Sequence, residues 1–265
     1  MNRQENSVKK RHLHIVPVGT SILMNYGWKN GDPLPPKDKL LTWLKESPRE
    51  RSAELNGLLW FFEKQQCTNV HLLATDTDAC RLCRNVLSAF LIDKKINVTG
   101  VEAKDLLPAS FEEARDHVTF EAAVCAFREK IFSVADRAKK RGEIVMINAT
   151  AGLKSEVAVA ALVAAELSVS AYYLHQSMTE PVFLPTAAVD DKALHLLRKL
   201  YRESRSSDSG PGEKVTKHYL LRREDDLLRL EREGLVKLSY KRDGEISNAK
   251  LTRYGKHILK RSSQQ

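Results

Sequence analysis

Short apolar runs alternate with longer amphipathic segments from residue 12 to residue 186. Runs rich in β-branched and other apolar residues predict strands over 13–18, 70–74, 96–101, 144–148, 170–175 and 181–185. Helical periodicity between them predicts helices over about 37–65, 78–93, 119–141 and 153–168. Strands that alternate with helices are typical of a parallel sheet covered on both faces. We therefore expect an α/β fold with a Rossmann-like, mostly parallel sheet.

The pattern changes after residue 189. A basic helix is expected over 190–203, followed by a stretch rich in Ser, Gly and Pro over 204–214. A further helix, 220–233, ends at Gly234, which suits a helix C-terminus. A predicted hairpin, with Asp-Gly in its turn region, and a last helix from Thr252 complete this part. This order is typical of a small winged helix-turn-helix domain. The predicted divisions are 12–188 for the α/β domain, 189–213 for a helix and linker, and 214–262 for the winged domain.

Three of the expected strands end in small polar clusters. These clusters are Gly19-Thr20-Ser21, with Asn25 a little further on, then Thr75-Asp76-Thr77, and finally the loop from Asn148 to Ser155. Ligands of open parallel sheets bind outside the carboxyl ends of the strands. Three such clusters, one of which carries a lysine, indicate a nucleotide-like ligand.

The last of these loops has the features of a phosphate site. Asn148-Ala149-Thr150-Ala151-Gly152-Leu153-Lys154 links a strand to a helix N-terminus, where free N–H groups attract anions. Lys154 adds a mobile positive charge. The spacing does not match a Walker A loop or a Gly-x-Gly-x-x-Gly motif. An ordinary turn with a solvated lysine is the alternative.

Taken together, these loops resemble those of CARF domains, and in particular the CRISPR-associated ring nucleases that carry a C-terminal winged helix. The Gly-Thr-Ser turn and the Asn-Ala-Thr-x-Gly-x-Lys loop carry most of the likeness, which runs over about residues 12–186. Ala151 departs from the pattern, in which glycine is more usual. Because alanine rarely takes positive φ, this departure bears on the geometry of the loop.

The resemblance implies a homodimer that binds cyclic oligoadenylate, most simply cyclic tetra-adenylate, and that serves antiviral defence by switching off type III CRISPR signalling. A ribose 2′-OH would attack the adjacent phosphorus without a metal or other cofactor, which leaves a 2′,3′-cyclic phosphate. Lys154 would stabilise the phosphorane, and Ser21 would contact a phosphate oxygen or hold the ribose. The expected ligand contacts are Gly19, Thr20, Asn25, Thr75, Asn148, Ala149, Thr150, Ala151, Gly152 and Leu153.

Two other functions are compatible with the sequence. A sensor could bind the ring without cutting it and regulate transcription by binding DNA through the winged domain. A signal-activated RNase would need an Arg-x4–6-His motif, and Arg253 and His257 are one residue too close for that. The sequence indicates no histidine as a general base, because His12 and His14 flank the first strand and are expected to be structural or exposed.

Composition and charge narrow the class of protein. Hydrophobic residues make up 42% of the chain and charged residues 29%, as in globular proteins. No apolar run approaches the roughly 20 residues of a membrane span, and the polar, basic N-terminus lacks a signal-peptide pattern, so we expect a cytoplasmic location. From residue 190 onward there are 19 Lys and Arg against 12 Asp and Glu, a net +7 of the total +9, which suits contact with nucleic acid.

The four cysteines leave two interpretations open. Cys80 and Cys83 have the spacing of a metal or redox motif, but Cys67 and Cys125 form no second pair. Reduced cysteines, in the core or half-buried, are the favoured interpretation, with metal or redox chemistry as the alternative.

Overall fold

The structure is a computed structural model that describes residues 11–108, 116–150, 154–175, 177–184, 191–206, 223–241 and 245–262. The chain forms two compact units, Met1–Pro181 and Val182–Gln265. Within the described residues, no helix is both long enough and apolar enough to cross a bilayer.

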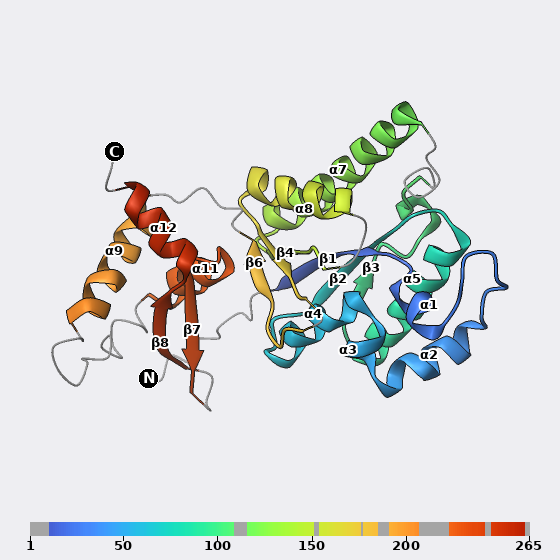
Figure 1. The fold of residues 1–265 in the computed structure, drawn as a ribbon, viewed down its shortest axis with the longest axis horizontal. Helices are drawn as coiled ribbons and strands as arrows, with labels where there is room; N and C mark the ends of the chain where they lie inside the picture. The colour runs from blue at the N-terminus through green and yellow to red at the C-terminus, as the bar shows by residue number, and fades with distance from the viewer. Residues whose placement is uncertain are drawn as a thin grey trace, which may run out of the picture. The chain divides into compact units, whose positions relative to one another are not determined.

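A six-stranded sheet, whose first five strands belong to the first unit, organises the chain up to Leu184 (Figure 1). Its order is β3-β2-β1-β4-β5-β6, and the pairs from β3 through β5 are all parallel. The strands are β1 (His12–Val18), β2 (Asn69–Ala74), β3 (Asn97–Thr99), β4 (Ile144–Asn148), β5 (Ser170–Tyr173) and β6 (Val182–Leu184). The predicted α/β class and mostly parallel sheet are confirmed.

Helices cover both faces of this sheet. On one face α4 (Ala53–Glu63) and α5 (Asp78–Asp93) pack against strands β1 to β4, and on the other α7 (His117–Lys140) and α8 (Lys154–Leu167) pack against β1, β4 and β5 (Figure 1). The chain steps outward from β1 to β2 and β3, then returns to β4 on the other side of β1. Because parallel crossovers are right-handed, this reversal sends the later helices to the opposite face.

The single long helix predicted over 37–65 is wrong. The structure has three helices there, α2 (Lys37–Glu46), α3 (Pro48–Arg51) and α4. Pro48 disfavours a helical conformation at the residue before it and cannot continue a hydrogen-bonded helix. Ser52 has an extended backbone, and its hydroxyl accepts a hydrogen bond from Leu55 N, which is an N-cap that starts a new helix.

The remaining elements follow the sequence pattern closely. Helix α5, helix α7, helix α8 and strand β4 lie within two residues of their predicted bounds. Strand β3 is shorter than predicted, because Gly100 takes a φ of +78 and ends it. A short helix α1 (Ser21–Tyr26) follows β1, and a 3-10 turn η1 (Ala103–Asp105) follows β3.

The second unit has its own apolar core. Helices α9 (Asp191–Ser206), α11 (Glu224–Arg232) and α12 (Arg253–Ser262) pack with the antiparallel hairpin of β7 (Val236–Tyr240) and β8 (Ile246–Leu251). Gly234 follows α11 with a φ of +71, the conformation expected at this position. The first residues of the predicted linker are helical, because α9 runs to Ser206. The rest of the linker and the Asp-Gly turn lie outside the described residues, so the winged helix-turn-helix assignment stays a prediction.

Candidate functional site

Two of the three predicted polar loops, the one after β1 and the one after β4, follow neighbouring strands. Strands β1 and β4 are adjacent and parallel, and the direction of connection reverses between them. Ligands of open α/β sheets bind at the carboxyl ends of the strands beside such a reversal. The Gly19-Thr20-Ser21 turn follows β1 and the Ala149-Thr150 segment follows β4. The topology therefore places both loops at one edge.

A cavity of about 320 Å³ lies at this edge, within the size range of small-ligand sites. We call it the carboxyl-edge cavity. It contains Ser21, Asn25 and Thr150, which were predicted as site residues. The full lining is Ser21, Asn25, Arg49, Glu50, Ala53, Asn56, Thr150, Tyr173, Leu174 and His175.

Ser21 is held by a buried carboxylate. Its hydroxyl donates to Glu54 Oε2 at 2.5 Å, and Ser52 donates to the same oxygen at 2.8 Å. The amide of Gly19 donates to Glu54 Oε1 at 3.1 Å, and only 1% of Glu54 is exposed. Glu54 thus ties the β1 loop to the start of α4.

These contacts determine what the Ser21 hydroxyl can offer a ligand. Its one proton is committed to Glu54, and its Oγ also accepts from the amide of Ala53 at 3.3 Å. A hydroxyl has one donor and two acceptor sites, so one acceptor site remains. Ser21 can therefore accept a hydrogen bond from a ligand hydroxyl, whereas donation to a phosphate oxygen would break its bond to Glu54.

Asn148 fixes the second loop from inside. It is fully buried, its amide donates to the carbonyl of Glu54 at 3.1 Å, and its Oδ1 accepts from Thr150 N at 2.9 Å. The Thr150 hydroxyl accepts from Leu174 N at 3.1 Å. Asn148 and Thr150 thereby link the β4 loop to α4 and to the end of β5.

Several predicted contacts are already used within the chain. The amides of Gly19 and Thr150 donate to Glu54 and Asn148, and the amide of Ala149 donates to Tyr172 O at 2.8 Å. Thr20 is half-buried at the start of α1. Thr75 pairs with Leu107 in an isolated β-bridge and is only 2% exposed. It does not line the carboxyl-edge cavity.

The lysine loop is described only at its two ends. Ala151, Gly152 and Leu153 lie outside the described residues. Helix α8 begins at Lys154, whose side chain also lies outside them. The predicted role of Lys154 therefore stays a prediction, although the helix start is where the sequence pattern places it.

His175 is a cavity residue that the sequence analysis missed. Its Nδ1 accepts a hydrogen bond from the amide of Ser177 at 3.2 Å and lies 2.8 Å from the Ser177 hydroxyl. Because an amide can only donate, the neutral ring carries its proton on Nε2. His175 comes two residues after β5, and the strand predicted over 170–175 ends on it, so the strand-end rule that identified Ser21 would also have identified it.

Arg49 and Glu54 were also missed. Arg49, at the start of α3, lines the carboxyl-edge cavity, pairs with Glu63 at 2.8 Å and donates to Asn56 O at 3.4 Å. Both residues belong to the segment predicted as one long helix, so the rule that looks for polar residues at strand ends did not apply to them. Only the helix breaks at Pro48 and Ser52 bring them to the sheet edge.

His14 and three of the cysteines are buried parts of the fold. His14 is buried, with one ring nitrogen 2.8 Å from Gln66 O and the other 3.1 Å from the Tyr172 hydroxyl, and burial lowers its pKa to about 4. Cys80 and Cys83 are buried in α5, and burial raises the pKa of the Cys67 thiol to about 12. No cluster of three or more His, Cys, Asp or Glu able to hold a metal occurs among the described residues.

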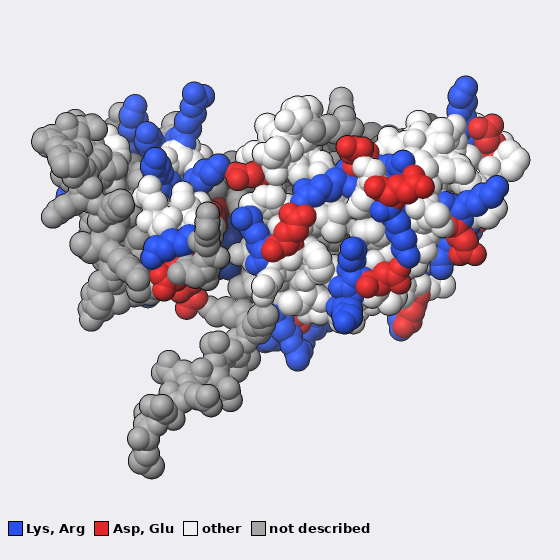
Figure 2. All heavy atoms as spheres, turned by 90° about the horizontal axis from the view of Figure 1, so that it is seen from below, with Lys and Arg blue, Asp and Glu red and all other residues white. Residues whose placement is uncertain are grey.

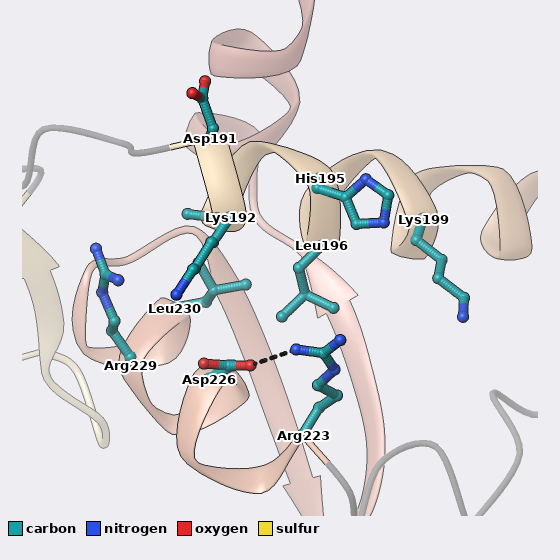
Figure 3. A pocket seen from close by; sticks show the side chains of 10 residues that line it. Asp191, Lys192, His195, Leu196, Lys199, Arg223, Asp226, Arg229 and Leu230 are labelled. Carbon is teal, nitrogen blue, oxygen red and sulfur yellow. Dashed lines mark hydrogen bonds and ion pairs between the residues drawn. The ribbon is translucent and has the colours of Figure 1, made fainter.

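The second unit has a separate cavity of about 640 Å³ between α9 and α11. Lys192, His195 and Lys199 line it from α9, and Arg223 and Arg229 line it from the α11 side (Figure 3). Asp226 pairs with Arg223 at 3.1 Å. Asp191 also lines this cavity. On the visible face of the first unit, acidic and basic side chains are interspersed (Figure 2).

Comparison with known families identifies the chain's relatives. Residues 49–187 match the model of the family described as CRISPR-associated protein (Cas_APE2256), which is more than half of the chain. The chain belongs to this CRISPR-associated family. The match includes Arg49, Glu54, Thr150 and His175 of the site and begins after the β1 loop that carries Ser21.

Comparisons with curated proteins and with solved structures give less information than the family match. No curated protein matches it in sequence. Among solved structures it is similar to the crystal structure of protein VC1899 from Vibrio cholerae, with 12% identity and a TM-score of 0.38. That similarity covers 94% of this chain, which spans 64% of the length of the VC1899 chain.

Proposed function

We propose that the protein is a ring nuclease that binds and opens cyclic oligoadenylate, with cyclic tetra-adenylate as the simplest ring. The observation that carries the proposal is the carboxyl-edge cavity, which is lined by Ser21, Thr150 and His175 from the segments that follow three strands, with the start of α8 four residues after Thr150. The membership in a CRISPR-associated family supports a substrate from CRISPR signalling.

In this proposal Ser21 positions the nucleophile. A ribose 2′-OH donates to the remaining acceptor site of Ser21 Oγ, which turns the 2′-oxygen lone pairs toward the adjacent phosphorus. As the O2′–P bond forms, the 2′ proton passes to Ser21 Oγ and the Ser21 proton passes to Glu54, 2.5 Å away. Such relays need groups already within hydrogen-bond reach.

The same step breaks the P–O5′ bond. The Nε2–H of His175 donates a hydrogen bond to the departing 5′ oxygen, which takes its proton from water, and the proton held by Glu54 returns to water. Lys154 stabilises the charge on the phosphorane oxygens, the role that its place at a helix start favours. The products are a 2′,3′-cyclic phosphate and a 5′-hydroxyl, and no metal is required.

The active form in this proposal is a homodimer. A ring of four identical nucleotides has two-fold symmetry, so two copies of the carboxyl-edge cavity could contact opposite nucleotides. A cavity of about 320 Å³ in one chain would then hold only part of the ring. Cleavage at two opposite linkages would give two dinucleotide products.

The decisive experiment follows cyclic tetra-adenylate by mass spectrometry in the presence of EDTA. Linear products with a 2′,3′-cyclic phosphate support the proposal. A ring that stays intact with protein in excess contradicts it. Activity restored only by a divalent metal would contradict the metal-free mechanism and leave ring cleavage in place.

The second unit favours a second candidate function. The protein would be a cyclic-oligoadenylate sensor that does not cleave the ring and that regulates transcription by binding DNA. Its favouring observation is the cavity between α9 and α11, with lysines and arginines on both helices. The first turn of α11 weighs against it, because Glu224, Asp225 and Asp226 would repel phosphates there. A sensor would hold cyclic tetra-adenylate intact and bind duplex DNA more weakly as salt rises, and Lys192→Ala with Lys199→Ala would reduce that binding.

A further inference from the structure

One part of the sheet surface is polar where a packed helix would require apolar residues. Strand register places Asn69 beside Asn97 and His71 beside Thr99. Leu13 of β1 pairs with Asn69, so these residues share one face of the sheet, since side chains two apart on a strand point the same way. Helix α7 packs against β1 and β4 of that sheet.

A cavity of about 560 Å³ lies over these polar positions. We call it the β2–β3 cavity. Asn69, His71, Asn97 and Thr99 line it from the strands, and Arg137 and Arg141 line it from the end of α7. Arg11, just before β1, completes its basic rim. None of the residues of the carboxyl-edge cavity line this one.

The acidic residues around the β2–β3 cavity are neutralised by other groups. Glu143 pairs with Arg141 at 2.7 Å, Asp105 with Lys130 at 3.1 Å and Glu102 with Lys104 at 2.7 Å. Among the described residues, Arg11 and Arg137 have no carboxylate within ion-pair distance. Two guanidinium groups are therefore left to attract an anion.

His71 adds an unsatisfied buried group. It is 8% exposed, and its Nε2 is buried without a hydrogen-bond partner among the described residues. Its Nδ1 lies 2.9 Å from Thr99 Oγ1, and the Thr99 hydroxyl is 3.4 Å from Val70 O. Gly100, with a positive φ, brings the backbone against the ring, because a Cβ there would lie 3.1 Å from His71 Cε1. Buried polar atoms without partners are rare and call for a ligand or water.

We propose that the β2–β3 cavity is a second ligand site, which binds an oxyanion through Arg137, Arg11 and the Nε2–H of protonated His71. The protonated ring satisfies every hydrogen bond in the cluster. Its Nδ1–H donates to Thr99 Oγ1, the Thr99 hydroxyl donates to Val70 O, and Nε2–H is left for the anion. Anion binding is then coupled to the uptake of one proton.

The groups that face His71 explain why the proton arrives with the anion. In the free protein burial lowers the pKa of His71 to about 4, and Lys130 and Arg137 of α7 lower it further, whereas Asp105 of η1 opposes them. A bound anion would offset the two cations and supply the missing acceptor for Nε2. The ligand is either a free inorganic oxyanion or the phosphate of a nucleotide, since the cavity is large enough for both.

Sulfate is the first probe, because its own charge does not change over the pH range tested. We expect wild-type protein to bind sulfate in isothermal titration, and to bind it more tightly at pH 6 than at pH 7.5. Adenosine 5′-monophosphate is the second probe, and tighter binding of it than of sulfate would assign the site to nucleotides. Weaker binding would assign it to inorganic anions.

Variants make the test specific to this cavity. Arg137→Gln should weaken sulfate binding about tenfold, as the loss of a charge-assisted contact does. His71→Gln should remove the pH dependence. Arg128→Gln is the control, because Arg128 lies on the same helix but pairs with Glu166 at 2.6 Å. Absence of binding to either probe at millimolar concentration overturns the proposal, as does equal binding by Arg137→Gln and Arg128→Gln. Ring cleavage should be unchanged in Arg137→Gln, so the two proposals fail separately.

Discussion

The hydroxyl of Ser21 and the carboxylate of Glu54 form a 2.5 Å hydrogen bond that joins the loop after β1 to the first turn of α4. The bond fixes the direction of the Ser21 proton, because Glu54 is ringed by three donors and can only accept. Of the two roles that the sequence leaves open for Ser21, this geometry favours holding the ribose over donating to a phosphate.

The first prediction concerns this pair. Ser21→Ala removes the acceptor for the 2′-OH, and Glu54→Gln removes the fixed orientation of Ser21. Each should slow ring opening about 10²-fold, the lower range for lost acid–base contributions. Binding of the ring should change little, since other contacts hold the phosphates. Single-turnover cleavage of cyclic tetra-adenylate, together with a separate binding titration, measures both quantities.

Ser52→Ala is the matched control for a purely structural effect. Ser52 donates to the same Glu54 oxygen and caps α4, but it does not line the carboxyl-edge cavity. We expect a loss of about 1 kcal/mol in the free energy of unfolding, as for other N-caps, with a near-normal rate of cleavage. If Ser52→Ala slows cleavage as much as Ser21→Ala, the proposed role of Ser21 is wrong.

The second prediction concerns Lys154, at the first position of α8. Lys154→Ala should abolish measurable ring opening, because it removes the main positive charge that the sequence places at the phosphates. Lys154→Arg should retain part of the activity, since charge is kept and shape is changed. Lys64→Ala is the control, because Lys64 lies over the ring of Trp60, away from the carboxyl-edge cavity. Cleavage by Lys154→Ala at the wild-type rate would remove Lys154 from the mechanism.

The sheet could be predicted from the sequence because its strands are regular apolar runs. Ile15, Leu72 and Ile147 lie in the centres of β1, β2 and β4, and all three are buried. Parallel strands that are covered on both faces need such runs, and their carboxyl ends can be read directly from the next polar residue. This is why Ser21 and Thr150 could be found before the structure.

The partners of these residues could not be found in the same way. Glu54 meets Ser21 across 33 positions of sequence, and this contact depends on the break at Ser52 that starts α4. Asn148 was predicted as a ligand contact, and in the structure its side chain donates to Glu54 O and accepts from Thr150 N. A single sequence shows which polar residues end a strand, but it does not show which of them are consumed by the fold.

The third prediction concerns His175. His175→Ala should slow ring opening, because it removes the Nε2–H donor to the departing oxygen, and His175→Gln, which keeps an N–H donor, should retain part of the rate. Ser177→Ala should have a smaller effect, because Ser177 contacts only the Nδ1 side of the ring. Single-turnover rates of cleavage, together with a separate binding titration of cyclic tetra-adenylate, make the comparison. Weaker binding of the ring with an unchanged single-turnover rate would show that His175 only helps to bind it.

The last prediction concerns the stability of the first unit and its buried histidines. Burial lowers the pKa of His14 to about 4, below the value of about 6.5 expected in an unfolded chain. The unfolded chain therefore binds the proton first, and stability that is complete above pH 6.5 is lost as the pH falls toward 4. This one group accounts for a loss of about 2 kcal/mol by pH 5 and about 3 kcal/mol in full, and His71 shifts in the same direction. Urea unfolding at pH 7.5 and pH 5 measures the difference.

His14→Gln should be less stable at pH 7.5, because it loses ring contacts with Phe61 and Tyr172. It should nonetheless lose less stability than wild type between the two pH values, and an equal loss would show that His14 is not the titrating group.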